Sequence, residues 1–548
     1  MCWIVVFWKL GAPALMDPDE AHYAQLTREM RHAGNWMMPL LDGLPYIDKP
    51  VLFHWLQGLA IAVLGETEIA MRLPSAIAAL ALFWMTQWTG ARLFDDRVGV
   101  RAWLMLATVP MTFMLASIGI FDMVFTACLF GAVAFALVSA LRNRPGLQYV
   151  SYVLLSLAVM TKGPVALVLA GLFFLVGMAC GQESRRALLS LHWVAGAFIS
   201  VALSLPWFVW MYHTLGWPFV HQYALAGNLY YISQPASFSN RAFNHTLYVS
   251  TFLAGFFPWS VLVIGGAIDT LNRWRRSVRI PPEERLLWAW AGTVFIFFSL
   301  ARFKVDRYVY PAAPACCLLA ARAWMSVSVP RPEIGAARDS TFTRWSIATL
   351  GLVLVVVSAV GAYTLFDLGL DLPAAAIVIP ISLAAGGAAL AVVTFRQRVV
   401  SPTLFTSLLM ALLVIYACVA AIGLPVLEST RPTAAVAAGL RPKLAANERV
   451  GLYRLEKWRF SLRYYLEHPV SRLQNSGEVK EFLNNKGGYI LMFDEDFTRL
   501  RNDGVKLRSV DERRAVTGTT GKGLRRQKWG ALVVATSDDT PRTEEKPR

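Results

Sequence analysis

Long apolar runs constrain this chain more than any other feature of its sequence. Hydrophobic residues make up 56% of the chain and charged residues only 16%. The apolar residues gather in stretches of roughly 20, the length that a helix needs to cross a bilayer. The sequence therefore excludes an ordinary soluble domain and predicts an α-helical polytopic membrane protein.

Hydropathy predicts roughly thirteen membrane spans. They lie near residues 2–15, 69–90, 98–118, 120–141, 147–161, 163–180, 187–213, 247–268, 285–301, 307–325, 345–366, 373–395 and 403–424. The first span is short and contains Lys9, which leaves open a start codon upstream of Met1.

Basic residues predict the orientation of these spans, because Lys and Arg in short loops stay on the cytoplasmic side. Threading the chain from a cytoplasmic N-terminus places one set of arginines on that side: Arg92, Arg97, Arg101, Arg142, Arg144, Arg185, Arg186, Arg273 to Arg285, Arg331, Arg338, Arg344, Arg396 and Arg398. The net charge of +16 is then mainly a topology signal. It does not call for a nucleic-acid partner.

The same topology leaves three long segments on the outer side of the membrane. Residues 1–424 are expected to form the membrane domain, and its outer loops 16–68 and 214–246 are long enough to hold chemistry. Residues 425–536 are expected to form a periplasmic α/β domain. Residues 537–548 have the composition of a disordered tail.

Short strand-like and helical runs support the α/β assignment of the C-terminal segment. The strand-like runs are Val450–Tyr453, Tyr489–Phe493 and Ala531–Ala535, and a helical run covers Glu478–Asn484. The mixture of β-branched and aromatic runs with helical stretches is typical of a small α/β domain.

An acid-rich stretch, MDPDEAHYAQLTREMRHAG, opens the first outer loop. Asp17 fits an N-cap, Pro18 the first helical position and Glu20 the third, so local helix chemistry accounts for all three as a capping box. Asp19 is left over, although the helix dipole alone also favours an acid there. Tyr23 lies one turn further on the same face, and the pattern predicts an amphipathic helix on the membrane surface.

Several cations occupy positions that the positive-inside rule disfavours. They are Lys49 in LPYIDKP, Lys162 in MTKGP, and Arg302, Lys304 and Arg307 in ARFKVDRYVYP. Any one of them could be a snorkelling side chain at a helix end. Cations that converge from separate loops instead suit an anionic head group such as a phosphate.

A second acid, Asp122 in SIGIFDMVF, lies at the outer mouth of a predicted span, where an ionisable group is expensive and is a functional hypothesis by default. Acids beside a phosphate-sized group of cations suit displacement at the anomeric carbon of a sugar. The cations would stabilise charge on a departing carrier phosphate, and Asp19 would orient or deprotonate an acceptor.

Six segments together resemble a known family. They are DPDEAHYAQLTREM, GNWMMPLLDGLPYIDKPVLFHWL, RLPSA, AVMTKGPVALVL, FFPWS and KVDRYVYPAAPA, in order from about residue 15 to 325. The combination resembles the bacterial GT-C glycosyltransferases related to lipid A aminoarabinose transferase (ArnT) and, more distantly, the protein O-mannosyltransferases. The resemblance implies a GT-C fold with about thirteen spans and a small C-terminal periplasmic α/β domain.

The resemblance also implies roles for particular residues. Asp19 matches the acid expected to be catalytic, and Asp122 matches a second acid of the family. The expected substrate-binding residues are Tyr23, Tyr46, Lys49, Lys162, Lys304, Arg307 and Tyr308. Some members bind a divalent cation near the acids, which makes Asp48 and His221 the candidate metal ligands here. No acid stands beside His221 in FVHQYALAGNLYY, which departs from the family pattern.

The function expected from these features is transfer of a sugar, such as 4-amino-4-deoxy-L-arabinose, from undecaprenyl phosphate to lipid A or another periplasmic acceptor. The alternative acceptor is a protein hydroxyl, as in protein O-mannosyltransferases. A lipid transporter or flippase would call for charges at mid-membrane and inverted repeats, neither of which is apparent. A membrane scaffold would leave the outer acids and cations without a role. The sequence does not name the sugar, the metal requirement or the oligomeric state.

Overall fold

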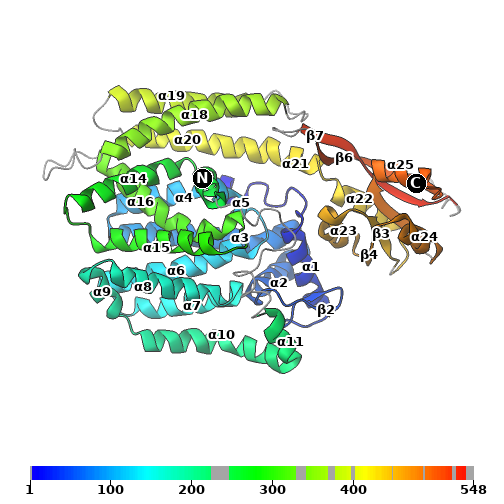
Figure 1. Ribbon diagram of the computed structural model, residues 1–548, viewed down its shortest axis with the longest axis horizontal. Coiled ribbons are helices and arrows are strands. Elements are labelled where there is room, and N and C mark those ends of the chain that lie inside the picture. The colour runs from blue at the N-terminus through cyan, green and yellow to red at the C-terminus, as the bar shows by residue number, and fades with distance from the viewer. Residues whose placement is uncertain are drawn as a thin grey trace.

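The computed structural model describes residues 3–223, 246–328, 341–367, 377–396, 402–446, 448–485, 488–520 and 526–538. Predicted features at residues 224–245, Arg331, Arg338, Arg398 and most of the tail therefore lie outside the described residues. Figure 1 shows a stack of helices with nearly parallel axes and a separate strand-containing region beyond one end of the stack.

The helices up to the first gap begin with a short π-helix at Trp3–Phe7. They continue as α1 (Asp19–His32), α2 (Leu52–Leu64), α3 (Glu68–Leu93), α4 (Asp96–Ala107), α5 (Pro110–Ala116), α6 (Phe121–Leu141), α7 (Leu147–Lys162), α8 (Val165–Ala179), α9 (Gln182–Leu189), α10 (Trp193–Leu215) and α11 (Trp217–Phe219). The short strands β1 (Leu40–Leu41) and β2 (Leu44–Pro45) form a hairpin after α1.

The later membrane-region helices are α13 (Leu247–Gly255), α14 (Trp259–Arg275), α15 (Pro282–Leu300), the 3₁₀ helix η3 (Asp306–Ala312), α16 (Ala313–Ser328), α18 (Thr341–Asp367), α19 (Val378–Arg396), α20 (Pro402–Cys418) and α21 (Leu424–Ser429). A short π-helix at Val419–Gly423 joins α20 to α21.

Among the described residues, five helices are long and apolar enough to cross a membrane, or seven if each of two bent pairs counts as one span. The protein is thus a multi-pass membrane protein, while the count of thirteen spans stays a prediction. The spans expected at residues 98–118 and 247–268 are not continuous helices. The first is bent by 68° between α4 and α5, and the second by 110° between α13 and α14. Prolines explain the breaks: Val109 before Pro110 is extended, and Pro258 stands at the second bend.

Buried tryptophans and close glycine contacts hold the helices together. Trp259 donates its indole N–H to Thr108 at 2.9 Å, and Trp290 donates to the carbonyl of Pro311 at 2.9 Å. A Cβ added to Gly90 of α3 would lie 2.6 Å from the Cα of Gly99 in α4. Backbones that approach this closely need glycine at the crossing.

The C-terminal α/β region covers residues 433–537. Its elements are α22 (Thr433–Leu440), β3 (Val450–Tyr453), α23 (Arg459–Leu466), β4 (Val470–Leu473), α24 (Ser476–Asn484), β5 (Tyr489–Phe493), α25 (Asp494–Asn502), β6 (Leu507–Thr520) and β7 (Arg526–Ser537). The strands form a five-stranded sheet of order β4-β3-β5-β7-β6. Strand β3 pairs in parallel with β4 and β5, and β7 is antiparallel to β5 and β6.

Successive side chains of a strand point to opposite faces of this sheet, and helices cover both faces. Leu491 packs in the cluster of Val436 and Leu462, which come from α22 and α23. Its neighbour Met492 packs with Val479 of α24 and Leu500 of α25 on the other face. The three expected strand segments and the expected helix are all present in this region.

Helix α1 lies between the helix stack and the C-terminal α/β region (Figure 1), and it packs against α2 and α23. Ten of its residues are buried, including the polar residues Gln25, Thr27 and Arg28. Protein therefore covers the polar face of α1 as well as its apolar face, and the expected place of this helix on the membrane surface stays a prediction.

Candidate functional site

The capping box expected at the start of α1 is not formed. The helix begins at Asp19, and its N-cap residue Pro18 makes no side-chain cap bond. Asp17 instead accepts hydrogen bonds from the backbone N–H groups of Phe460 and Ser461 in α23. Burial raises the pKa of Asp17 to about 6, although these hydrogen bonds oppose the shift. The carboxylate that looked like a local cap therefore binds a distant helix.

Glu20 also has a long-range partner. Its carboxylate pairs with Arg72 of α3, with Nε–Oε1 and Nη2–Oε2 distances of 2.6 and 2.9 Å, and both side chains are 1% exposed. Glu20 further accepts from the backbone N–H of Gly119 at 2.8 Å and of Met16 at 2.9 Å. A buried carboxylate needs such full pairing. Glu20 thereby ties the start of α1 to the segment that precedes Asp122.

The two acids singled out in the sequence lie on opposite sides of one arginine. Arg307 donates Nη2 to Asp19 and Nε to Asp122, the latter at 3.0 Å. Lys162 donates to the other oxygen of Asp122 at 2.7 Å. Asp122 and Lys162 are only 3% and 6% exposed at their side chains, whereas Asp19 is 35% exposed. Asp19 is therefore the acid that solvent or a ligand can reach.

These four residues, Asp19, Asp122, Lys162 and Arg307, form what we call the charge network. They come from the first turns of α1 and α6, the last residue of α7 and the start of η3. The ends of antiparallel helices bring them together at one end of the stack. The network contains two carboxylates and two cations, so its charges balance, which is how buried ionisable groups remain tolerable.

Aromatic rings line the buried side of the charge network. The ammonium of Lys162 lies 4.2 Å from the ring centre of Tyr308 and 5.1 Å from that of Phe125. Tyr23 packs edge-on against Phe121 at 5.1 Å. The phenol of Tyr23 is close enough to interact electrostatically with the carboxylates of Asp19 and Asp122. The rings exclude water from the cations, which strengthens electrostatic interactions there.

A second ion pair borders the network. Lys49 donates to Asp48 at 2.8 Å. The ammonium of Lys49 also lies close enough to that of Lys162 for the two positive charges to repel each other. Tyr46 packs edge-on against His22 at 4.7 Å. Burial lowers the pKa of His22 to about 4, opposed by Asp48, so the imidazole is neutral near pH 7. The YIDKP segment therefore lies beside the charge network, as expected from its motif.

Lys304 does not join the network. Its ammonium donates to the carbonyl oxygens of Ser299 and Ala301 and lies 5.7 Å from the ring centre of Tyr248. This structure does not confirm its expected place beside Lys162 and Arg307. The 3₁₀ turn of η3 that carries Arg307 begins only at Asp306, and Lys304 lies before it.

The residues expected to hold a metal do not come together as a site. Among the described residues, no three His, Cys, Asp or Glu side chains are arranged to hold an ion. Asp48 pairs with Lys49, and His221 is exposed in the last described turn before residue 224.

Sequence reasoning missed the pair of Glu20 and Arg72. Arg72 lies inside the long apolar helix α3 and is fully buried, and an arginine at such a depth calls for a partner. That signal was present in RLPSA. It was overlooked because Glu20 already had a local explanation as part of a capping box.

The sequence is similar to a known protein family and to several named transferases. Residues 48–210 match the family described as dolichyl-phosphate-mannose-protein mannosyltransferase. The undecaprenyl phosphate-alpha-4-amino-4-deoxy-L-arabinose arabinosyl transferase of Pectobacterium carotovorum subsp. carotovorum (strain PC1) is 30% identical over 363 residues, covering 63% of this chain and 61% of that protein. The transferase of the same name from Enterobacter sp. (strain 638) is 28% identical over 330 residues, covering 58% and 57%. The matches thus span less than two thirds of each relative.

A solved structure matches over nearly the whole chain. ArnT from Cupriavidus metallidurans bound to undecaprenyl phosphate aligns with a TM-score of 0.71 at 20% identity, covering 99% of this chain and 98% of that one. The ArnT-type GT-C fold is therefore confirmed, and so is the resemblance inferred from the sequence motifs.

Proposed function

We propose that this chain, which has the ArnT fold, is a glycosyltransferase that moves a sugar from undecaprenyl phosphate to an acceptor on the periplasmic side of the inner membrane. The observation that carries the proposal is the charge network, in which the partly exposed Asp19 pairs with Arg307 and the buried Asp122 pairs with both Arg307 and Lys162. The relatives named for undecaprenyl phosphate-linked aminoarabinose support the donor class.

The proposed reaction is a displacement at the anomeric carbon. An acceptor oxygen forms a bond to that carbon while the bond from the carbon to the phosphate oxygen breaks, and the electron pair stays on the carrier phosphate. Arg307 and Lys162 stabilise this leaving phosphate. Asp122 holds both cations in place by its two oxygens. Asp19 orients the acceptor and accepts its proton if the acceptor is a hydroxyl.

Donor binding changes the partners of Arg307 in this proposal. In the structure its guanidinium is shared between Asp19 and Asp122. A donor phosphate offers a competing anion of bidentate geometry, for which a planar guanidinium is well suited. Arg307 then turns from Asp19 toward the phosphate, and Asp19 becomes available to the acceptor.

Lipid A is the proposed acceptor, and 4-amino-4-deoxy-L-arabinose the proposed sugar. The names of the curated relatives favour this sugar. An anionic lipid phosphate also agrees with the cations in the outer loops. A protein hydroxyl is the second candidate, because the family that matches residues 48–210 is described as a protein mannosyltransferase.

Mass spectrometry of lipid A tests the acceptor. Lipid A from cells that carry the gene should gain the mass of the amino sugar under conditions that induce the modification, and a deletion strain should lose it. An unchanged lipid A together with a lost protein glycoform would reverse the choice of acceptor.

The proposed topology places the charge network on the periplasmic side. Arginines at the opposite end of the stack gather together, since Arg142 donates to the carbonyl of Arg92 and contacts Glu283, and Arg285 pairs with Glu183. This end is rich in the basic residues that the positive-inside rule keeps in the cytoplasm.

Cysteine labelling tests this topology. In intact spheroplasts, a membrane-impermeant maleimide should label Lys480→Cys in α24 and spare Arg276→Cys after α14, both of which replace exposed residues. The reverse pattern would contradict the proposed orientation, and labelling of both variants after lysis shows that each site is reactive.

A further inference from the structure

Helix α23 begins without a cap from its own segment. Its N-cap residue Trp458 makes no side-chain cap bond. The N–H groups of Phe460 and Ser461 donate instead to Oδ1 of Asp17, at 2.9 and 3.0 Å. The first turn of a helix leaves such N–H groups unsatisfied, and its positive end favours a carboxylate. Asp17 therefore caps a helix whose first turn lies 443 residues away in the sequence.

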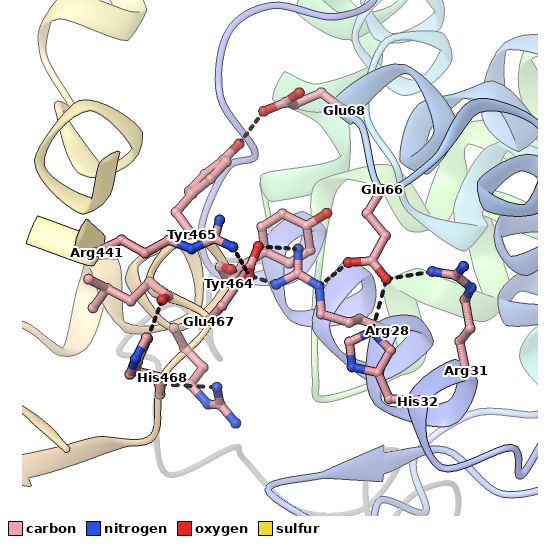
Figure 2. A network of polar contacts seen from close by, with 12 residues as sticks. Arg28, Arg31, His32, Glu66, Glu68, Arg441, Tyr464, Tyr465, Glu467 and His468 are labelled. Atoms are coloured by element: carbon pink, nitrogen blue, oxygen red, sulfur yellow. Dashed lines mark hydrogen bonds and ion pairs between the residues drawn. The ribbon is translucent and has the colours of Figure 1, made fainter. Parts of the chain in front are cut away.

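A second contact joins α23 to the chain just before Asp17. Leu15 donates its backbone N–H to the hydroxyl of Tyr465 at 2.7 Å. The same hydroxyl donates to Glu68 at the start of α3 at 2.9 Å, as Figure 2 shows. Tyr465 thus connects the segment that leads into α1 with a membrane helix.

Two further contacts join α23 to α1 after Asp19. The imidazole of His22 stacks on Phe460 with ring centres 4.2 Å apart. Arg28 donates to the carbonyl of Tyr464 at 2.6 Å and lies 3.7 Å above the Tyr464 ring. Figure 2 shows Arg28 between Tyr464 on one side and Glu66 on the other. Arg28 is buried, so this contact is shielded from solvent.

Helix α23 therefore holds the chain on both sides of Asp19. The contacts at Leu15 and Asp17 precede the acid, and those at His22 and Arg28 follow it. The carboxylate of Asp19 itself pairs with Arg307 on a different element. A displacement of about 1 Å in a reacting group is enough to slow catalysis by roughly 10²-fold. The position of Asp19 relative to Arg307 thus depends on the position in which α23 packs against α1 and the segment before it.

We propose that Asp17 is a positioning residue, which caps α23 so that docking of the C-terminal α/β region sets Asp19 opposite Arg307 and Asp122. The proposal rests on the proposed transferase function. Asp17 acts through Asp19, and its role requires an oxygen acceptor at Oδ1 rather than a negative charge.

Two substitutions at position 17 separate an acceptor from a charge. Asp17→Ala removes the acceptor and leaves two N–H groups of α23 unpaired, so kcat should fall by about 10- to 100-fold with a nearly unchanged KM for the donor. Asp17→Asn keeps an oxygen acceptor and is itself a good cap. It should restore most of the parent kcat.

Asn475→Ala is the matched control. Asn475 caps α24 of the same region by accepting from the N–H of Glu478 at 2.9 Å, and the helix it caps lies on the sheet face away from α23. It should lower the melting temperature of the detergent-solubilised protein about as much as Asp17→Ala does. Only Asp17→Ala should lower kcat.

Hydrogen exchange provides a readout that does not depend on transfer. Amides of residues 19–32 should exchange faster in Asp17→Ala than in the parent, and at the parent rate in Asn475→Ala. A parent that releases no carrier phosphate from any undecaprenyl-phosphate sugar would defeat the proposed function, whereas the exchange result would still stand. Unchanged kcat and exchange in Asp17→Ala, an equal loss of kcat in Asn475→Ala, or failure of asparagine to rescue would each overturn the positioning role.

Discussion

Asp19→Asn is expected to lower kcat by about 10²- to 10⁴-fold while the protein remains folded. Asparagine has nearly the shape of aspartate but cannot accept a proton or carry the charge that orients an acceptor. Folding should persist because Asp19 is 35% exposed at its side chain and Arg307 keeps its bond to Asp122. Release of free undecaprenyl phosphate from a labelled donor measures turnover, and thermal melting in detergent measures folding.

Asp42→Asn is the control for this experiment. Asp42 is another acid of the first outer loop, 48% exposed at its side chain, and it pairs with Arg463 at 3.1 Å. It adopts a φ of 53°, a left-handed conformation that asparagine tolerates well. Turnover should match that of the parent, because asparagine keeps the oxygen that accepts the hydrogen bond of Arg463 from α23. Near-normal turnover of Asp19→Asn would instead leave Asp19 as an acid placed by the dipole of α1.

Asp122→Asn is expected to lower both stability and turnover, because it leaves Lys162 with a neutral partner. Lys162 is 6% exposed, and breaking a buried pair by neutralising one member costs about 3–5 kcal/mol. Arg307 also loses its second carboxylate and with it the orientation set by Nε. Thermal melting and donor turnover, measured on the same preparation, should both fall.

The double variant Asp122→Asn/Lys162→Met separates the two effects. Removing the lysine charge removes the unpaired buried cation, so the melting temperature should recover toward that of the parent. Turnover should stay low, because the leaving phosphate lacks Lys162. Lys304→Met is the matched cation deletion, since Lys304 donates to backbone carbonyls outside the network, and it should melt and turn over like the parent. Recovery of turnover in the double variant would contradict the role of Lys162.

Local and periodic patterns determined much of this protein before any tertiary contact was considered. Apolar runs indicated membrane helices, and short strand-like runs located β3 and β5 to the residue. Asp122, Lys162 and Arg307 stood out because charges near a membrane are expensive and need partners. Their meeting in one network follows from helix ends that lie at one end of the stack.

Only the tertiary structure decided which partner each polar side chain has. A carboxylate satisfies the free N–H groups of a nearby helix and of a distant one equally well, so local pattern assigned Asp17 and Glu20 to α1. Packing gives Asp17 to α23 and Glu20 to Arg72. The same limit applies to Lys304, because a spacing of three residues from Arg307 does not specify the turn between them. The sequence thus determined which groups must be paired, and the three-dimensional packing of segments far apart in the chain decided with what.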